Sequence, residues 1–243
     1  MRYETGVYWC RGRAALVNQD AVVLQQVLTR WGRVLMAAVC DGMGGISFGE
    51  EVSGYAAEQL RDWFYGELLT MIRKRKPLWV IRRSLDRRTF YMQRQLERYA
   101  AREEISVGTT MTVLVLWEKT YLLWHLGDSR VYRLRGGYME QLTEDHVHGA
   151  EKLTKCLGSF GWFVPAHGMG TLRKGDGVLL CTDGFRRRVS KEELCGVMSY
   201  DAACLRETTG EEWIERRLKE IGEVCMKRGE RDNLSAVYVR CGT

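Results

Sequence analysis

The chain has 243 residues, of which 45% are hydrophobic and 28% charged, and this balance excludes a disordered protein and predicts a globular one with a core of its own. No run approaches the roughly 20 apolar residues of a spanning helix, and the first residues lack an apolar leader, so we expect neither a membrane span nor a secretory leader. The net charge is +6, and residues 61–104 account for all of it with twelve Lys or Arg and six acidic residues.

That basic segment has two interpretations. It could form a surface that binds acidic partners such as phosphorylated proteins or nucleic acid. It could instead form two amphipathic helices with solvated arginine faces, which is the commoner case and which we favour because no nucleic-acid motif accompanies it. The eight cysteines include no CxxC pair and no Cys/His cluster, so we expect thiols of a reducing compartment and a cytoplasmic location. With only two prolines, no linker is evident, and we predict one domain over residues 1–243.

The N-terminal half predicts strands followed by two long helices. Residues 7–24 are typical of a strand, a turn and a second strand. The apolar run 33–40 ends abruptly at Asp41, as a buried strand does when it delivers a polar residue to the edge of a sheet. Helices are expected at about 49–74 and about 78–102, because apolar residues recur there at helical spacing.

The C-terminal half predicts mainly hairpins. Two-residue turns, Glu118-Lys119 and Gly136-Gly137, separate pairs of alternating runs. The expected strands lie at 110–117, 120–126, 130–135, 138–142, 177–182 and 234–240, and a helix is expected at 211–228. Paired helices beside hairpin-linked strands favour an α+β fold over a parallel βαβ sheet.

Five aspartates lie where predicted strands begin or end, most of them beside glycine or a small polar residue: Asp20, Asp41, Asp128, Asp183 and Asp232. Any one Asp-Gly pair is ordinary turn chemistry. Together, however, carboxylates at strand ends can converge at one edge of a layered sheet. Converged carboxylates with few His or Cys neighbours form a hard-ligand set, which suits Mg²⁺ or Mn²⁺ better than zinc or copper.

The ordered motifs of the chain resemble those of bacterial metal-dependent Ser/Thr protein phosphatases of the protein phosphatase 2C family. The matching pieces are NQDA (18–21), VCDGMGG (39–45), GTTMTVLV (108–115), GDSR (127–130), TDGF (182–185) and DNLS (232–235). The resemblance covers nearly the whole chain. It implies a four-layer α-β-β-α sandwich, in which two antiparallel sheets are flanked by helices and the active site lies in a cleft at one end.

The resemblance also implies roles for individual residues. Asp41 would bridge two Mn²⁺ or Mg²⁺ ions, the carbonyl of Gly42 would bind one of them, and Asp183 would join Asp41 as a catalytic residue and metal ligand. Asp232 would complete the binuclear site, and Asp20 would reach the second ion. A third, weaker metal is held in many relatives by the counterparts of Asp128 and Asp183.

The implied reaction is hydrolysis of phosphoserine and phosphothreonine by a metal-activated bridging water, without a side-chain nucleophile. Phosphorylated proteins would be the substrates, and a Ser/Thr protein kinase of the same cell would supply them. No membrane partner is expected, and nucleic acid is the least favoured partner.

Two departures from the family pattern leave an alternative open. Relatives carry an arginine that grips the substrate phosphate where this chain has Ala15, so either Arg13 substitutes by a change of register or phosphate binding is weaker. The mobile flap of relatives is reduced to residues 147–151, which predicts a more open cleft. The alternative function is therefore a weakly active or inactive phosphatase-like module that binds phosphoprotein.

Overall fold

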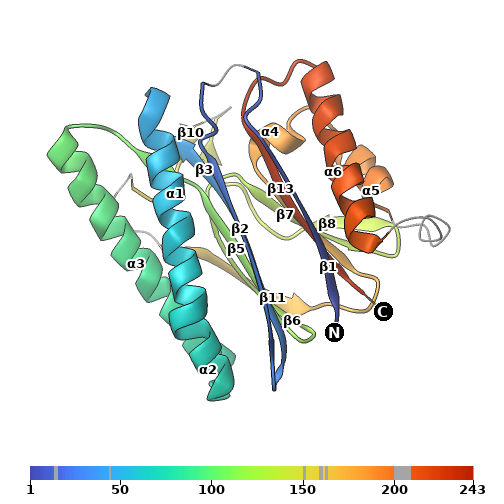
Figure 1. Ribbon diagram of the computed structural model, residues 1–243. Helices are drawn as coiled ribbons and strands as arrows, with labels where there is room; N and C mark the ends of the chain where they lie inside the picture. Colours follow the sequence, from blue (N-terminus) through green and yellow to red (C-terminus); the bar gives the residue numbers. More distant parts are fainter. Residues whose placement is uncertain are drawn as a thin grey trace.

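Two antiparallel β-sheets face each other, and helices cover the outer face of each (Figure 1). The computed structural model describes residues 1–13, 16–43, 45–149, 152–158, 161, 164–199 and 209–242. Helix α1 begins beside the end of strand β3, so one end of the sandwich brings a helix start and several strand ends together (Figure 1).

The first sheet contains five strands, and every neighbouring pair is antiparallel. In spatial order these strands are β1 (Tyr3–Cys10), β13 (Leu234–Cys241), β12 (Gly177–Cys181), β7 (Arg130–Arg135) and β8 (Tyr138–Gln141). The central strand β12 delivers Asp183 to the sheet edge, and its neighbour β13 begins two residues after Asp232.

The second sheet is also antiparallel. In spatial order its strands are β11 (Ala166–Thr171), β6 (Thr120–Leu126), β5 (Met111–Trp117), β3 (Gly32–Met43) and β2 (Asp20–Thr29). The short strand β4 (Gly108–Thr109) pairs with the end of β3 at Gly42 and Met43. A separate two-stranded hairpin joins β9 (Val147–His148) to β10 (Lys152–Leu153).

Helices form the two outer layers. The second sheet is covered by α1 (Gly45–Trp63), a π-helical turn (Phe64–Leu68), α2 (Leu69–Arg73) and α3 (Leu78–Glu103). The first sheet is covered by α4 (Asp183–Arg186), α5 (Lys191–Met198) and α6 (Gly210–Lys227). Capping boxes begin α5 at Ser190 and α6 at Thr209, so each helix start satisfies its own backbone donors.

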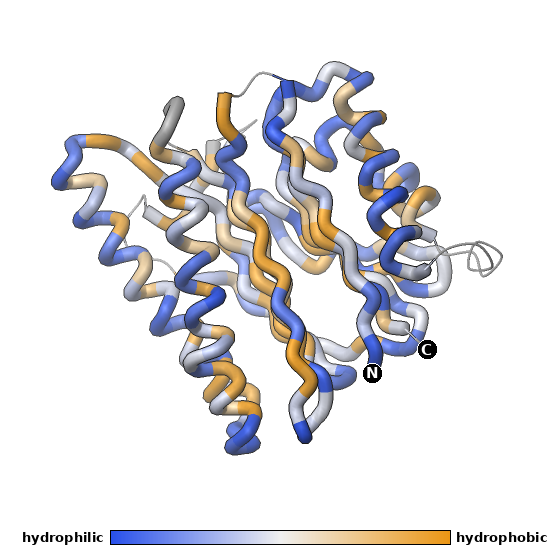
Figure 2. The backbone as a smooth tube through the Cα atoms, in the orientation of Figure 1, coloured by the Kyte–Doolittle hydropathy of each residue, from blue (hydrophilic) through white to orange (hydrophobic). Residues whose placement is uncertain are grey.

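Strand β3 lies inside the protein with both faces covered. Its residues Leu35, Ala37 and Val39 belong to the core between the sheets, whereas Met36 and Ala38 face the core under α1 and α3. This explains a continuous apolar run in place of alternation. Figure 2 shows the same distribution, with hydrophobic residues along the strands and many hydrophilic residues on the helices.

The predicted four-layer α-β-β-α sandwich is confirmed. The two predicted long helices are present, but the first begins at Gly45 and contains a π turn. The predicted bounds of the first two strands are wrong: β1 begins at Tyr3, and the second strand only starts at Asp20 and continues to Thr29.

Strand β11 and helix α5 are not among the predicted elements. β11 contains two glycines, which favour strands little. Gly170 is needed there because an added Cβ would lie 2.7 Å from the Tyr121 ring. The seven cysteines within the described residues are free thiols, and no described helix is long and apolar enough to cross a membrane.

Candidate active site

The site begins with two aspartates on neighbouring strands. Asp20, the first residue of β2, is the direct cross-strand partner of Asp41 near the end of β3. The Gly42 amide donates to the Gln19 carbonyl at 3.1 Å and so continues the pairing beyond the two carboxylates. The ladder therefore fixes both carboxylates at one end of the second sheet.

Asp20 is buried, with 3% of its surface exposed. The Thr182 hydroxyl donates to its Oδ2 at 3.0 Å, while its Oδ1 has no hydrogen-bond partner among the described residues. The pKa of Asp20 is raised to about 7, chiefly by burial and also by the charges of Asp232 and Asp183, while the hydrogen bonds that it accepts oppose the increase. A buried acceptor with one unfilled oxygen is what a cation ligand requires.

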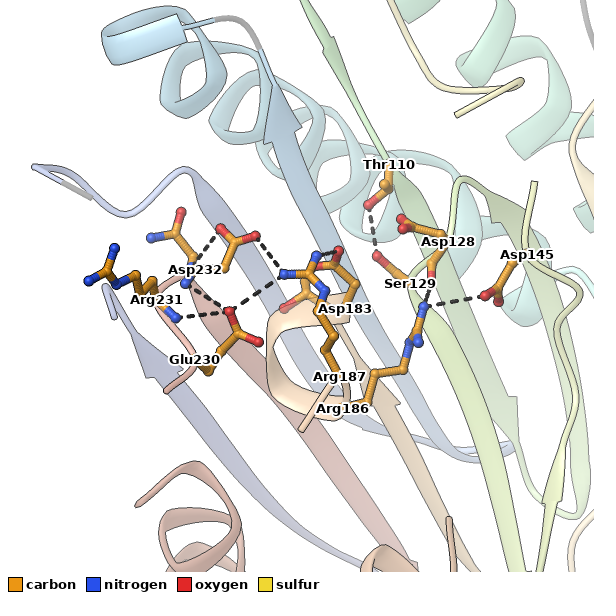
Figure 3. Close-up of polar contacts among 12 residues, drawn as sticks. Thr110, Asp128, Ser129, Asp145, Asp183, Arg186, Arg187, Glu230, Arg231 and Asp232 are labelled. Atoms are coloured by element: carbon orange, nitrogen blue, oxygen red, sulfur yellow. Dashed lines mark hydrogen bonds and ion pairs between the residues drawn. The ribbon is translucent and has the colours of Figure 1, made fainter. Parts of the chain in front are cut away.

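Asp41 is held by its backbone. Its amide donates to the Thr110 hydroxyl at 2.9 Å, and the Thr110 amide donates to its carbonyl at 2.9 Å. Thr110 in turn shares a 2.9 Å hydrogen bond with Ser129 (Figure 3). The GTT and GDSR motifs thus support Asp41. Burial, followed by the charge of Asp20 and the other site carboxylates, raises the pKa of Asp41 well above its usual value.

The glycines after Asp41 allow a close backbone approach. A Cβ on Gly42 would lie 2.0 Å from the Gly49 carbonyl oxygen, and one on Gly49 would lie 2.8 Å from the Gly42 carbonyl oxygen. Both distances are too short for a side chain, so only glycine lets the first turns of α1 lie against the end of β3.

The first sheet contributes Asp183 and Asp232. Asp183 opens the single turn α4 directly after β12, and Asp232 precedes β13. Burial and the nearby Asp183 charge raise the pKa of Asp232. The guanidinium of Arg187 lies between these two carboxylates and forms an ion pair with each (Figure 3).

Glu230 anchors the same corner from below the surface, with 3% of its side chain exposed. Its Oε1 accepts from the amides of Arg231 at 2.9 Å and Asp232 at 3.2 Å, and lies 3.5 Å from Arg187 Nη1. Glu230 thereby orders the loop that presents Asp232.

Asp128 lies at the other side of Asp183. The pKa of Asp128 is raised to about 6, first by burial and then by the Asp183 charge, while the Arg186 charge opposes the increase. Arg186 donates to the Asp128 carbonyl at 3.1 Å and to the Asp145 carboxylate at 3.3 Å. The consecutive residues Arg186 and Arg187 therefore lie on two sides of the site: Arg186 contacts Asp128 and Asp145, and Arg187 contacts Asp183 and Asp232.

The donor chemistry suits a hard divalent cation, because these carboxylates raise one another's pKa and Asp20 has an unfilled oxygen. Among the residues that the structure describes, no three His, Cys, Asp or Glu side chains are arranged around one point as a metal site requires. The carboxylates of Asp183 and Asp232 face Arg187 instead. Metal binding to these ligands would therefore require side-chain rotation.

Asn233 links two loops around the site. Its Nδ2 donates to the Arg11 carbonyl at 2.6 Å, and its Oδ1 accepts from the Gln19 amide at 2.8 Å. An added Cβ on Gly12 would lie 2.0 Å from the Asp232 carbonyl oxygen, so the turn carrying the exposed Arg13 packs beside Asp232. Arg13 is thus near the site, whereas Ala15 lies outside the described residues.

Residues 147–151, where a shortened flap is predicted, begin with β9 of the short β9–β10 hairpin, and Ala150 and Glu151 lie outside the described residues. A cavity of about 460 Å³ borders Asp20 between β1, β2 and α1, and its lining includes Trp9 and Glu50. The site therefore adjoins open space at the edge of the sandwich.

Two residues of the site are absent from the set predicted from sequence. Arg187 stands in the run RRR directly after TDGF, and Glu230 precedes DNLS by two residues. The charge run was the available signal for Arg187. A buried Glu230 could not be inferred, because an isolated Glu in a polar loop is usually exposed.

The basic segment 61–104 comprises the end of α1, the π-helical turn, α2 and α3, and nearly all of its basic side chains are exposed. Several of its arginines are neutralised locally: Arg88 pairs with Glu67 at 2.7 Å, and Arg94 with Glu97 at 2.9 Å. The exposed basic turn 73–76 lies at the opposite end of the helical layer from the start of α1 (Figure 1). These contacts agree with solvated helix faces.

The family model described as protein phosphatase 2C matches residues 11–221, so the chain belongs to the protein phosphatase 2C family. The chain is an enzyme of the metal-dependent Ser/Thr protein phosphatase class, as its motifs predicted.

Individual relatives agree with this class. The chain is 25% identical over 209 residues to the protein phosphatase PhpP of Streptococcus pneumoniae serotype 2, with 78% of this chain and 82% of PhpP covered. The Streptococcus agalactiae Ser/Thr phosphatase matches its fold with a TM-score of 0.82 at 21% identity, over 98% and 99% of the two chains. The catalytic domain of PstP, solved with two manganese ions, matches with a TM-score of 0.75 at 24% identity, over 99% of each chain.

Proposed function

We propose that this protein removes phosphate from phosphoserine and phosphothreonine residues of proteins, and that the reaction takes place at the strand-end carboxylates. The observation that carries the proposal is the convergence of Asp20 and Asp41 from one sheet with Asp183 and Asp232 from the other. Elements far apart in sequence bring the four carboxylates within electrostatic range of one another, and divalent cations bound there would offset their mutual repulsion.

The residues that would hold two Mn²⁺ or Mg²⁺ ions are Asp41, Asp20, Asp183 and Asp232, with the Gly42 carbonyl. When bound, such ions lower the pKa of water and neutralise phosphoryl oxygens. A third ion held by Asp128 and Asp183 stays a prediction, and it would share Asp183 with Arg187.

The chain's own residues orient the ligands. The two hydrogen bonds to Thr110 fix the backbone of Asp41, the Thr182 hydroxyl fixes Oδ2 of Asp20, and Glu230 fixes the loop of Asp232. We expect the exposed Arg13, on the turn that packs beside Asp232, to contact a substrate phosphate. The cavity beside Asp20 offers room for the polypeptide around the phosphorylated residue.

The natural substrates would be proteins phosphorylated by a Ser/Thr protein kinase of the same cell. A cytoplasmic location remains a prediction that rests on cysteine usage. Neither an inactive phosphoprotein-binding module nor a nucleic-acid protein is favoured by a feature of the site, because all five aspartates are present and the basic helices are partly neutralised.

A direct assay tests the proposal. Hydrolysis of a phosphothreonine peptide and of a small aryl phosphate is measured with Mn²⁺, with Mg²⁺ and with EDTA, beside an Asp183→Ala variant. Turnover of both substrates that requires metal and is lost in the variant supports the proposal. Absence of turnover while Mn²⁺ is demonstrably bound would overturn it in favour of the binding module.

A further inference from the structure

Arg187 contacts two of the carboxylates that the proposed function assigns to metal ions, namely Asp183 and Asp232. It is the C-cap residue directly after α4, and its amide donates to the Asp183 carbonyl at 2.8 Å. One turn of helix therefore brings its side chain beside the Asp183 carboxylate, with which it pairs, and its Nη1 lies 3.5 Å from Asp232 Oδ2 (Figure 3).

A third carboxylate keeps Arg187 at this corner. Glu230 is buried and lies 3.5 Å from the same Nη1, and its other oxygen lies 3.4 Å from Nε of Arg188. Glu230 is not among the residues that would bind metal. It can therefore retain the Arg187 guanidinium at the rim of the site when Asp183 and Asp232 turn toward divalent ions.

We propose that Arg187 is a substrate-binding residue that competes with metal: its guanidinium neutralises Asp183 and Asp232 until divalent ions take them, and then binds the phosphoryl oxygens of the substrate. This inference rests on the proposed function and adds a residue to it. A guanidinium presents paired donors that match a phosphate. Its side chain is 38% exposed, so it is accessible from the open side of the site.

Arg187 would add a second arginine to the phosphate contact proposed for Arg13. Arg187 is the middle residue of the run of three arginines that follows TDGF. Arg186 is engaged with Asp128 and Asp145, and Arg188 contacts only Glu230 among the described acidic residues. Of the three consecutive arginines, only Arg187 contacts carboxylates assigned to the two-ion site.

The test compares Arg187→Gln and Arg187→Lys with Arg188→Gln as the matched control. Mn²⁺ affinity is first measured by calorimetry on metal-stripped protein without substrate. We expect Arg187→Gln to bind Mn²⁺ about tenfold more tightly, because no ion pair must be broken. The Mn²⁺ affinity of Arg187→Lys should lie between those of Arg187→Gln and the unaltered protein. The Mn²⁺ affinity of Arg188→Gln should stay within about twofold of that of the unaltered protein.

Steady-state hydrolysis of a phosphothreonine peptide at saturating Mn²⁺ is measured next. We expect Arg187→Gln to raise KM about tenfold with little change in kcat, since its contact is made to the bound phosphate. Inorganic phosphate as a competitive ligand should lose affinity by a similar factor. The proposal thus predicts that Arg187→Gln binds Mn²⁺ more tightly and phosphate more weakly than the unaltered protein.

Unchanged Mn²⁺ affinity in Arg187→Gln, or unchanged KM and phosphate affinity, would overturn the proposal. If Arg187→Gln does not fold, Arg187→Lys decides, because it keeps the charge and loses only the paired donors. The calorimetric measurements of Mn²⁺ and inorganic phosphate need no turnover. They therefore test Arg187 even if the unaltered protein hydrolyses no phosphopeptide, an outcome that would count against the proposed function alone.

Discussion

Asp20 and Asp41 lie directly opposite each other in the antiparallel ladder of β2 and β3. Like charges at facing positions of a sheet destabilise it. The chain nevertheless fixes this pair with backbone hydrogen bonds on both sides, from Gly42 to Gln19 and between Asp41 and Thr110. Repulsion between the two carboxylates destabilises the metal-free protein, and a bound cation would relieve it. Metal binding should therefore raise the stability of the fold.

Removal of one of these charges should stabilise the metal-free protein. In EDTA at pH 8, we expect Asp41→Asn to raise the free energy of unfolding by about 1 kcal/mol, because the cross-strand repulsion is lost. The same variant should lose both activity and the increase in Tm that Mn²⁺ gives. Asp62→Asn, which alters an exposed carboxylate on α1, is the control and should keep both. An Asp41→Asn protein that remained Mn²⁺-stabilised and active would contradict the assignment.

Gly42 and Gly54 make a matched pair for a test of backbone approach. An added methyl group at Gly42 collides with Gly49, whereas one at Gly54 would have no heavy atom within 4 Å. We expect Gly42→Ala to lower the free energy of unfolding by about 2–4 kcal/mol and to abolish activity. Gly54→Ala, in the interior of α1, should be neutral or stabilise by up to about 1 kcal/mol. Urea denaturation distinguishes these outcomes, and equal effects would show that the close approach is not required.

His125 predicts a pH dependence away from the carboxylates. Its Nδ1 lies 2.9 Å from the Thr112 hydroxyl and its Nε2 lies 3.0 Å from the Glu144 carbonyl. Because a carbonyl only accepts, Nε2 carries a proton, and the Thr112 hydroxyl can donate to Nδ1 of the neutral ring. Burial, followed by the neighbouring His146, lowers the pKa of His125 to about 4 from 6.5. The unfolded chain therefore binds more protons between these values.

The stability that this neutral ring contributes is present above pH 6.5 and is lost as pH falls through 4. We expect the free energy of unfolding of the unaltered protein to fall by up to about 3 kcal/mol more than that of His125→Asn over this window. Urea titrations in EDTA at several pH values measure the difference, in which the carboxylate contributions cancel. Parallel curves for the two proteins would refute the assignment of a neutral His125.

Arg13 should act on substrate and not on metal. Because it is exposed on the turn beside Asp232, we expect Arg13→Gln to raise KM for a phosphothreonine peptide about threefold while leaving Mn²⁺ affinity unchanged. Arg216→Gln, on the outer face of α6, serves as the control. A variant indistinguishable from this control in KM would assign Arg13 to the solvated surface.

Local sequence patterns predicted the helices and strands whose packing in the fold follows the same pattern. The apolar run ending at Asp41 became β3, and the two helical repeats became α1 to α3. The edge strand β11 was not predictable, because its glycines serve contacts with Tyr121 and Leu123 that only the folded sheet creates. Likewise, the start of β2 at Asp20 depends on its pairing with β3.

The aspartates of the candidate site could be predicted from the sequence, but the ion pairs that they form with arginine could not. The motifs located Asp20, Asp41, Asp128, Asp183 and Asp232, whose roles as ligands remain predictions. Sequence spacing could not show that Arg187 lies between two of them or that a buried Glu230 holds this arginine. Both facts arise from the folding of the loop before β13 against α4.

Diffraction at the manganese absorption edge, from crystals grown with Mn²⁺, would show whether the strand-end carboxylates hold metal. We expect two anomalous peaks roughly 3.5–4 Å apart, with Asp41 between them and Asp20, Asp183 and Asp232 around them. An active protein whose crystals show no manganese at this cluster would contradict the metal-dependent site proposed here.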